Sequence, residues 1–325
     1  MIFASGVRAR APFFRTAALA VGVGALLVAC GGGGSGNDGS VPVPSSSSST
    51  SPTTPTTSTP TTTTPPPPPP VVRTLATGAE LAPTLASPQP GSTALTGDNK
   101  QGIYVDRTSM ALVSAAGRLM YKDDARWVFG WLDVNGANWS FRVPTISLQT
   151  TSNSNLEFVT GSGWFASKTT MIGRYSVDGG ADRAWGPLNY SSSNALAVQQ
   201  KDMAGKWSTD ANAGYGMAFE MDADGNLTGS TTGALIGECS LTGSVLQTEP
   251  ATSHNMFNLK ITATNSATRP SDTACTMEQG EESDGLAAVY MDPVSTYPEE
   301  GAYRTLIFHG GTVTGGFLTN FLRKR

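Results

Sequence analysis

The sequence predicts an all-β protein in which antiparallel strands form one or two small β-barrels or β-sandwiches after a disordered tether. From Gly102 onward, short stretches rich in Val, Ile, Thr, Phe, Tyr and Trp alternate with Gly, Asn and Asp, which is the pattern of strands and turns. Amphipathic helical runs are scarce, and residues 194–205 are the best candidate for one short helix or a strand plus linker. The preceding region is dominated by Gly, Ser, Thr and Pro, which bury too little apolar surface to fold.

Residues 1–29 have the organisation of an export signal. Three arginines lie near the start, and a run of small and aliphatic residues follows over 16–29. This run suits the core of a signal peptide and is too short to cross the bilayer hydrocarbon, about 30 Å, as a helix. It ends in the letters LVAC, the last of which is Cys30.

This ending resembles the lipobox of bacterial lipoproteins, in which an aliphatic residue and two small or compact residues precede a cysteine. The resemblance implies that residues 1–29 are removed, that the thiol of Cys30 takes a diacylglycerol and that its new amine is acylated, for example with palmitate. Two or three acyl chains anchor a protein firmly. Gly31 stands where Asp would signal inner-membrane retention, which implies the outer membrane on either face. An ordinary secretory signal with an incidental cysteine is the alternative.

Residues 30–97 are expected to form the lipidated start and a disordered tether. Glycine dominates 31–39, whereas 41–70 is nearly all Ser, Thr and Pro and ends in six prolines. Proline runs favour the extended polyproline II form at about 3.1 Å per residue, so 41–70 could reach about 90 Å. The segment is either a spacer, glycosylated or not, that lifts a domain from the bilayer, or a neutral linker.

Charge and apolar content limit the partners. Removing residues 1–29 takes away three arginines and no acidic residue, so the formal charge changes from −4 to −7. An acidic chain without a basic cluster is a poor binder of nucleic acid, so no nucleic-acid partner is expected. The chain has no second long apolar run, so no transmembrane helix is expected.

The rest of the chain divides into a first β unit, 98–200, and a second β unit, 201–325. A weak internal repeat supports this division: GIYVD (from Gly102) parallels GKWST (from Gly205), AAGRLMYK (from Ala115) parallels ADGNLTGS (from Ala223), and FGWLDVNG (from Phe129) parallels LTGSVLQT (from Leu241). Chance similarity among β-hairpins is the alternative. The pattern looks like the small β-barrel modules of many envelope lipoproteins, including lipocalin-like ones and those that bind host proteins.

Cys239 and Cys275 are the two cysteines that remain besides Cys30. The cell envelope is oxidising, so the two remaining cysteines are expected to form a disulfide with each other within the second β unit. On the chain-entropy model, a bridge closing about 35 residues stabilises by about 4 kcal/mol. Free or metal-binding thiols are less favoured, because neither a Cys-x-x-Cys motif nor a suitable histidine spacing occurs.

Sequence motifs for catalysis, cofactors and metals are missing. The chain has no Gly-x-Ser-x-Gly elbow, phosphate loop or dinucleotide fingerprint, and we expect no cofactor and no metal. His254 and His309 are expected to be structural. The run from Asp222 to Asn226 has part of a calcium-loop spacing, but a hairpin turn explains it better. Residues 278–285 are expected to form an acidic solvated loop, with a cation or basic-partner site as the alternative.

Six tryptophans give a stronger indication of a ligand. Trp127 and Trp131 are four residues apart, so in a strand they face the same side, and they are the candidate ligand-facing aromatics; core packing is the alternative. We therefore expect a non-enzymatic binding or interaction module, held at the membrane by a lipid on Cys30, whose partner is an envelope or extracellular protein or a carbohydrate. A structural or assembly accessory of an outer-membrane complex is the alternative, and a hydrolase is less favoured.

Overall fold

The computed structural model describes residues 73–325 except 98–99, 150–155, 167–168, 210–214, 235, 269–271, 278 and 313–316. All the described residues belong to one compact unit, Pro68–Arg325. The export signal, Cys30 and the segment 41–70 lie outside the described residues. Within the described ranges, helical structure consists of four short 3₁₀ helices: η1 (Thr93–Thr96), η2 (Ser192–Ala195), η3 (Gln200–Met203) and η4 (Pro298–Glu300). None of them has the length or apolar content of a membrane-spanning helix.

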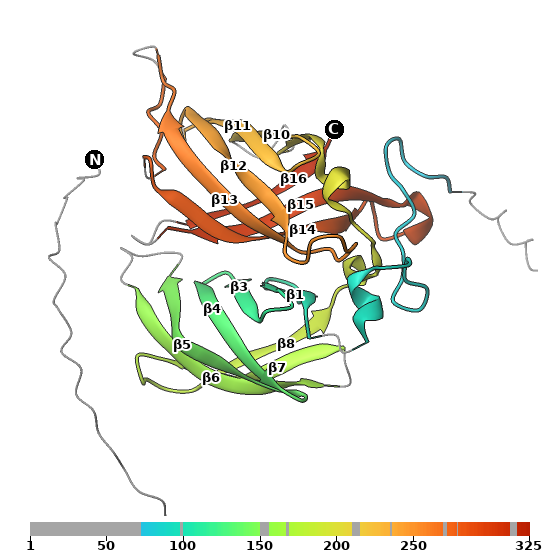
Figure 1. Ribbon diagram of the computed structural model, residues 1–325, viewed down its shortest axis with the longest axis vertical. Helices are drawn as coiled ribbons and strands as arrows, with labels where there is room; N and C mark the ends of the chain where they lie inside the picture. Colours follow the sequence, from blue (N-terminus) through green and yellow to red (C-terminus); the bar gives the residue numbers. More distant parts are fainter. Residues whose placement is uncertain are drawn as a thin grey trace, which may run out of the picture. The chain divides into compact units, whose positions relative to one another are not determined.

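The strands form two closed, antiparallel barrels of eight strands each, which confirms the all-β prediction (Figure 1). In both barrels each strand pairs with the next one along the chain, and the last strand pairs with the first. The first barrel comprises β1 (Gly102–Val105), β2 (Met110–Val113), β3 (Arg118–Lys122), β4 (Arg126–Asn135), β5 (Asn138–Gln149), β6 (Glu157–Ala166), β7 (Thr170–Val177) and β8 (Arg183–Tyr190).

The second barrel follows after a linker that contains η2 and η3, the two short turns found within or beside the predicted helical segment 194–205. It comprises β9 (Gly205–Ser208), β10 (Gly216–Met221), β11 (Asn226–Thr232), β12 (Cys239–Gln247), β13 (Phe257–Asn265), β14 (Glu282–Pro293), β15 (Ala302–Gly311) and β16 (Phe317–Lys324). The closing strand pair of each barrel is short: β1 and β8 join through two residue pairs, and so do β9 and β16.

The interiors of the two barrels are filled differently. Aromatic rings fill the first barrel around Trp185, whose ring centroid lies 4.2 Å from that of Tyr121 and 5.3 Å from that of Phe141. Leu, Val, Ile and Met side chains dominate the second, together with a contact of 5.4 Å between the rings of Phe219 and Phe308. Both interiors are therefore packed cores in which side chains occupy the barrel axis.

The internal repeat of the sequence coincides with equivalent elements of the two barrels. Its three pairs match β1 with β9, the β2–β3 turn with the β10–β11 turn, and β4 with β12. The turn glycines Gly117 and Gly225 have φ values of 84° and 89°, a backbone conformation that favours glycine. Their carbonyls accept equivalent hydrogen bonds from Leu132 (2.7 Å) and Val245 (2.8 Å). The two barrels thus share turn geometry as well as strand order.

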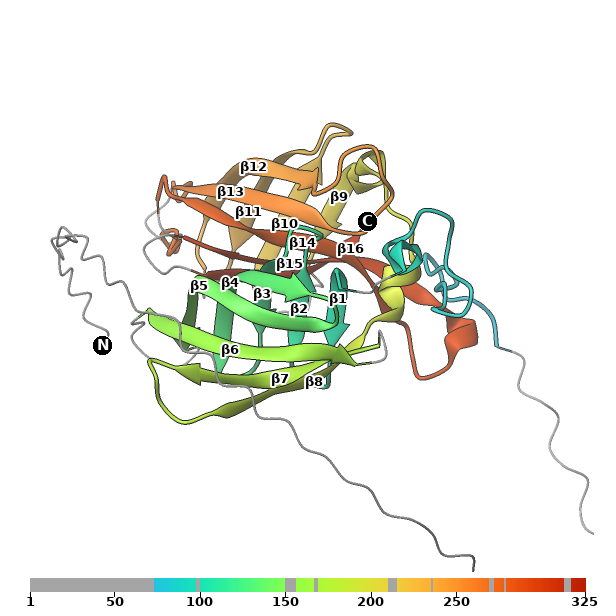
Figure 2. The ribbon, with the colours of Figure 1, turned by 60° about the horizontal axis from the view of Figure 1, so that its bottom comes forward.

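The barrels pack against each other through an apolar layer. Figure 2 shows β14 and β15 beside the first three strands of the first barrel. The layer is made by side chains that point out of both barrels: Ile103, Leu112, Met120, Met256, Leu286, Ala288 and Ile307. An ion pair of 2.9 Å between Arg118 and Asp284 lies beside this layer. Each side chain of the layer is at most 3% exposed, so the contact between the barrels is a third apolar cluster beside the two barrel interiors.

The acidic stretch 278–285 differs from the predicted solvated loop. From Glu282 onward its residues belong to β14. Lys260 of the neighbouring β13 pairs with Glu282 at 2.7 Å, and Asp284 pairs with Arg118 of the first barrel. The basic partners of these carboxylates are therefore residues of this chain.

The segment 73–97, which the composition assigns to the end of the tether, makes contacts that the sequence did not predict. Glu80 exchanges two backbone hydrogen bonds with Ala302, of 3.0 and 2.9 Å, and its carboxylate binds the guanidinium of Arg304. Arg73 binds Glu300 at 2.7 Å and stacks over the ring of Tyr297. We call residues 73–97 the strap, because their first part pairs with the β14–β15 hairpin and Gln89 with Ala195 of the linker before the chain enters the first barrel.

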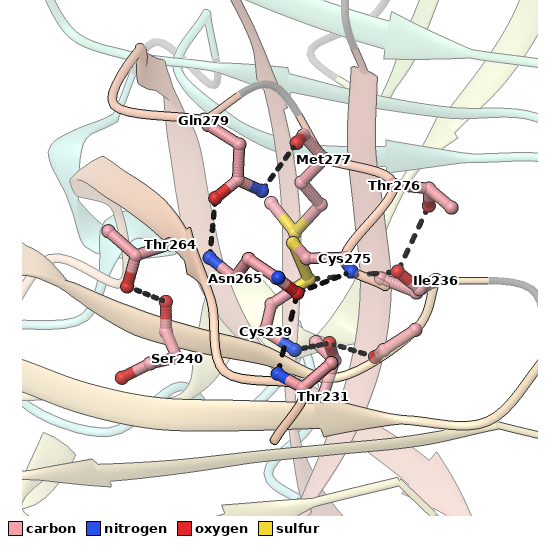
Figure 3. Close-up of a disulfide and its surroundings, with 12 residues drawn as sticks. Thr231, Ile236, Cys239, Ser240, Thr264, Asn265, Cys275, Thr276, Met277 and Gln279 are labelled. Carbon is pink, nitrogen blue, oxygen red and sulfur yellow. Dashed lines mark hydrogen bonds between the residues drawn. A yellow bond between two sulfur atoms is a disulfide. The ribbon is translucent and has the colours of Figure 1, made fainter. Parts of the chain in front are cut away.

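The predicted disulfide is present. Cys239 and Cys275 are joined, and their Cα atoms lie 4.9 Å apart (Figure 3). The segment that carries Cys275 is also held by hydrogen bonds, because the side-chain oxygen of Asn265 accepts from the Cys275 N–H at 3.0 Å and the carbonyl of Ile236 accepts from the N–H of Thr276 at 2.8 Å. The bridge therefore closes a loop between β12 and the approach to β14.

Candidate ligand-binding face

The outer surface of β4–β7 on the first barrel carries polar and aromatic side chains in register. Directly paired residues run across the four strands in one row: Asp133, Ser140, Ser162 and Arg174. The next row contains Asn135, Asn138, Trp164 and Ile172. Successive side chains of a strand point to opposite faces, so these residues share the outer face while Leu132, Trp139 and Phe165 point inward.

Trp131 borders the first of these rows. It pairs across the strands with Arg142, whose guanidinium carbon lies 5.8 Å from the centroid of the indole. A cation at this distance over an aromatic ring is attracted by its negative face. The side chain of Trp131 remains 39% exposed, so Arg142 restrains the ring without covering it.

Trp164 borders the same row on the other side and is 49% exposed. Next to it, Gly163 and Gly173 form a directly paired couple on β6 and β7. A Cβ on either glycine would approach the indole of Trp139 inside the barrel to 2.5 or 2.6 Å. The buried indole therefore requires glycine at both positions.

A surface hollow of about 490 Å³ lies over this glycine couple. Its walls include Trp164, Asp133, Asn138 and Arg174. The volume lies within the range of small-molecule sites, about 300–1,000 Å³. We call the surface around the hollow the tryptophan face, and define it by Trp131, Asp133, Asn138, Ser140, Arg142, Ser162, Trp164 and Arg174.

The charges of the tryptophan face are balanced. Asp133 pairs with Arg142 at 2.6 Å, and Arg174 pairs with Asp182 at 3.4 Å. All four side chains are more than half exposed, and exposed ion pairs contribute only about 0–1 kcal/mol. A polar group of a ligand can therefore replace one partner of either ion pair at little cost in free energy.

The two tryptophans predicted to face a ligand are separated by the structure. Trp131 lies on the tryptophan face, whereas Trp127 is only 9% exposed and packs edge-on against His309 of the second barrel, with 5.8 Å between the ring centroids. The outer surface of β4 runs from the contact between the barrels to the exposed face, and the register shifts between Phe129 and Trp131. Trp127 is therefore an interface residue and does not face a ligand.

Trp164 is not distinguished from the other tryptophans in the sequence analysis. The signal that distinguishes it is the alternation in 158–165, where Val159 and Phe165 are buried and Phe158, Thr160, Ser162 and Trp164 are exposed. A large aromatic at a position that alternation assigns to the polar side is informative. The arginines that accompany it on neighbouring strands cannot be found without the strand register.

The two histidines lie elsewhere in the molecule. His254 binds the carboxylate of Glu249 through Nδ1 at 2.7 Å, beside a cleft of about 370 Å³ at the end of the first barrel. His309 is buried between the barrels, where its Nδ1 and the hydroxyl of Thr319 are 2.7 Å apart. Burial, assisted by the nearby charge of Lys122, lowers the pKa of His309 to about 3.

The run from Asp222 to Asn226 forms the predicted hairpin turn. The Asp222 carboxylate accepts hydrogen bonds from the N–H groups of Asp224 (3.0 Å) and Asn226 (2.8 Å) and from the amide of Asn226 (2.7 Å). The hydrogen bonds from Asn226, and then those from the turn backbone, lower the pKa of Asp222. Its oxygens thus stabilise the turn itself.

Comparison with models of protein families, with curated proteins and with solved structures finds no match to this chain.

Proposed function

We propose that this chain is a lipid-anchored protein of the bacterial outer membrane that acts as a non-enzymatic binding module. Cys30 carries the lipid, residues 31–72 separate it from the folded unit, and the tryptophan face of the first barrel binds the ligand. The lipobox sequence supports the anchor. The ligand is an envelope or extracellular protein or a carbohydrate.

One observation carries the binding role. Trp131 and Trp164 expose 39% and 49% of their area on either side of a row whose members, Asp133, Ser140, Ser162 and Arg174, are all polar. Tryptophan contributes strongly to binding when it is desolvated by a partner, because it combines a large apolar area with little conformational entropy. The closed barrel fixes the backbone beneath both rings, so little order has to be gained on binding.

Two observations favour binding over the alternatives. The apolar outer surfaces of β1–β3 and β14–β15 cover each other, so these two surfaces are not open to a partner in an assembly. A hydrolase of the glycosidase type needs two converging carboxylates. On the tryptophan face, Asp133 and the adjacent Asp182 are each paired with an arginine.

The anchor is tested by Cys30→Ser. The variant should lose acylation, remain uncleaved or be released, and no longer fractionate with the outer membrane, because the serine hydroxyl cannot take the place of the thiol in the lipid transfer. Mass spectrometry of the amino-terminal peptide and fractionation of cells measure both effects. A variant that stays lipidated in the outer membrane would contradict the anchor.

The binding role is tested by photocrosslinking in intact cells. A benzoylphenylalanine in place of Ile172, which lies beside Trp164 in the outer row, should yield a crosslinked product, because benzophenone inserts into C–H bonds of proteins and sugars alike. The matched control places the same group at Phe321, an aromatic on the second barrel that is 48% exposed. Equal labelling at the two positions, or labelling at Ile172 that survives Trp164→Ala, would contradict the site.

A further inference from the structure

We infer that the ligand of the tryptophan face is a neutral oligosaccharide, an inference that rests on the proposed function and narrows its ligand to one class. Three properties of the face carry it: the distance between its two exposed indoles, the polar groups between them, and the absence of net charge on its charged pairs.

The two indoles are placed for a ligand several rings long. Trp164 pairs with Asn138 and Trp131 pairs with Arg142, so the two tryptophans differ by four positions along β5 and by two strands across the sheet. Standard strand geometry converts this to about 13 Å along the strands and about 10 Å across them. The C–H side of a sugar ring packs on the negative face of an indole, and a chain of sugars offers such sides at successive rings.

The groups between the indoles match hydroxyls. The row holds a carboxylate (Asp133), two hydroxyls (Ser140 and Ser162) and a guanidinium (Arg174). Each sugar hydroxyl donates one hydrogen bond and accepts others, so it needs both kinds of partner within reach. An apolar ligand would bury this row without offering it hydrogen-bond partners, and buried polar groups without partners cost binding energy.

The balanced charge distinguishes a neutral sugar from an anionic one. Arg142 and Arg174 are each paired with a carboxylate, of Asp133 and Asp182, so the two described arginines at this site are neutralised. Binding of sulfated or phosphorylated polymers depends on unneutralised Lys and Arg.

The dimensions of the hollow favour a small ligand over a protein. At about 490 Å³ it has the volume of a small-molecule site. A stable protein interface instead needs about 800 Å² on each partner with an apolar centre. Here the polar row lies between the aromatic residues, where a protein interface has its apolar centre.

The test applies the full chain, extracted in detergent, to an array of neutral oligosaccharides together with sulfated and sialylated ones. We expect binding to neutral oligosaccharides of several rings, changing less than twofold between low and high salt. Trp164→Ala and Trp131→Ala should each weaken it about tenfold, the loss of one aromatic contact. Trp164→Phe should keep part of it, and the matched control Phe321→Ala should leave it unchanged.

The outcomes separate this inference from the proposed function. Binding only to anionic glycans, or to no glycan on the array, would contradict the inference that the ligand is a neutral oligosaccharide. If the crosslinker at Ile172 then captures a protein in a Trp164-dependent way, the binding role stands and only the ligand class is wrong. If neither glycans nor a crosslinked partner is found, both the inference and the proposed function fail.

Discussion

At the scale of single residues, His309 is a titratable side chain buried between the two barrels. It is 2% exposed on β15, and its ring packs on Trp127 of the other barrel. Within the described residues its Nε2 is buried without a hydrogen-bond partner. A protonated imidazolium there would be desolvated and near Lys122, so the neutral ring is favoured.

This environment predicts acid sensitivity of the fold. The pKa of His309 is about 3 in the folded protein and about 6.5 in the unfolded chain, so between these values the unfolded chain holds a proton that the folded protein lacks. The free energy of unfolding should therefore fall as the pH falls below about 6.5, by at most about 1.4 kcal/mol per pH unit from this group. Denaturant unfolding at a series of pH values measures the slope.

The control is the same measurement on His309→Gln, which keeps a group for Thr319 but does not titrate. Its slope between pH 6.5 and 4.5, above most of the carboxylate titration, should be smaller than that of the wild type. An unchanged slope in His309→Gln would refute the assignment.

At the scale of elements, the disulfide ties the start of β12 to the segment that precedes β14. Beside the bridge, that segment forms parallel β-bridges between Glu238 and Ala274 and between Ala263 and Gln279. The Cys239 side chain is fully buried in the second barrel, whereas Cys275 packs against its core from outside. Substitution of Cys239 should therefore disturb the core of the second barrel more than substitution of Cys275.

Cys275→Ala should lower the free energy of unfolding by about 4 kcal/mol, the chain-entropy value for a loop of this length. Cys239→Ala should cost about 1 kcal/mol more, because it also removes a buried sulfur from the core. Chemical denaturation of the purified protein measures both. Wild type treated with reductant should match Cys275→Ala, and equal stability of reduced and oxidised wild type would contradict the bridge's contribution.

The alternation of buried and exposed residues along single strands could be predicted from the sequence. The element that covers the outer face of a strand could not. In β10, Met217, Phe219 and Met221 are buried and Ala218 and Glu220 exposed, as their period of two predicts. In β14 and β15 the apolar runs are continuous, because one face lines the barrel and the other meets the first barrel. A continuous run gives no sign of which element covers it.

The same limit applies to the candidate site. The disulfide and the polar hairpin at Asp222 could be predicted because each depends on residues near in sequence or few in number. The lipid on Cys30 stays a prediction, since Cys30 lies outside the described residues. The tryptophan face depends on the register of four strands, which a single sequence does not fix. Alternation could have selected Trp164, but not its placement beside Asp133 and Arg174.

At the scale of the whole molecule, the strap and the linker join the two barrels into one unit. Asn255 of the second barrel is fully buried, and its side chain binds the N–H of Val289 (2.7 Å) and the carbonyls of Val289 (2.6 Å) and Ser193 (3.1 Å). Its own N–H donates to the hydroxyl of Thr93 in the strap at 2.8 Å. One residue therefore connects the strap, the linker and β14 through its backbone N–H and its side-chain amide, and burial makes each of these bonds costly to lose.

These contacts divide the chain before the first barrel into two parts with different expected effects on stability. Deleting 41–70 should leave the melting temperature of the folded unit unchanged within about 2 °C, because Ser, Thr and Pro bury almost no apolar surface. Deleting 73–87 instead removes the two-bond pairing of Glu80 with Ala302 and the ion pairs of Arg73 and Glu80. Each kcal/mol lost should lower the melting temperature by about 2 to 4 °C.

Calorimetry of both deletions, compared with the full chain, tests the division, and Glu80→Ala serves as the point variant within the strap. The deletion of 41–70 should still reduce the access of antibodies to the barrels on cells, because a shorter spacer draws the folded unit toward the lipid. A large fall in melting temperature on deleting 41–70 would show that this segment also packs on the folded unit. In that case only the glycines after Cys30 would remain to give the barrels their freedom from the membrane.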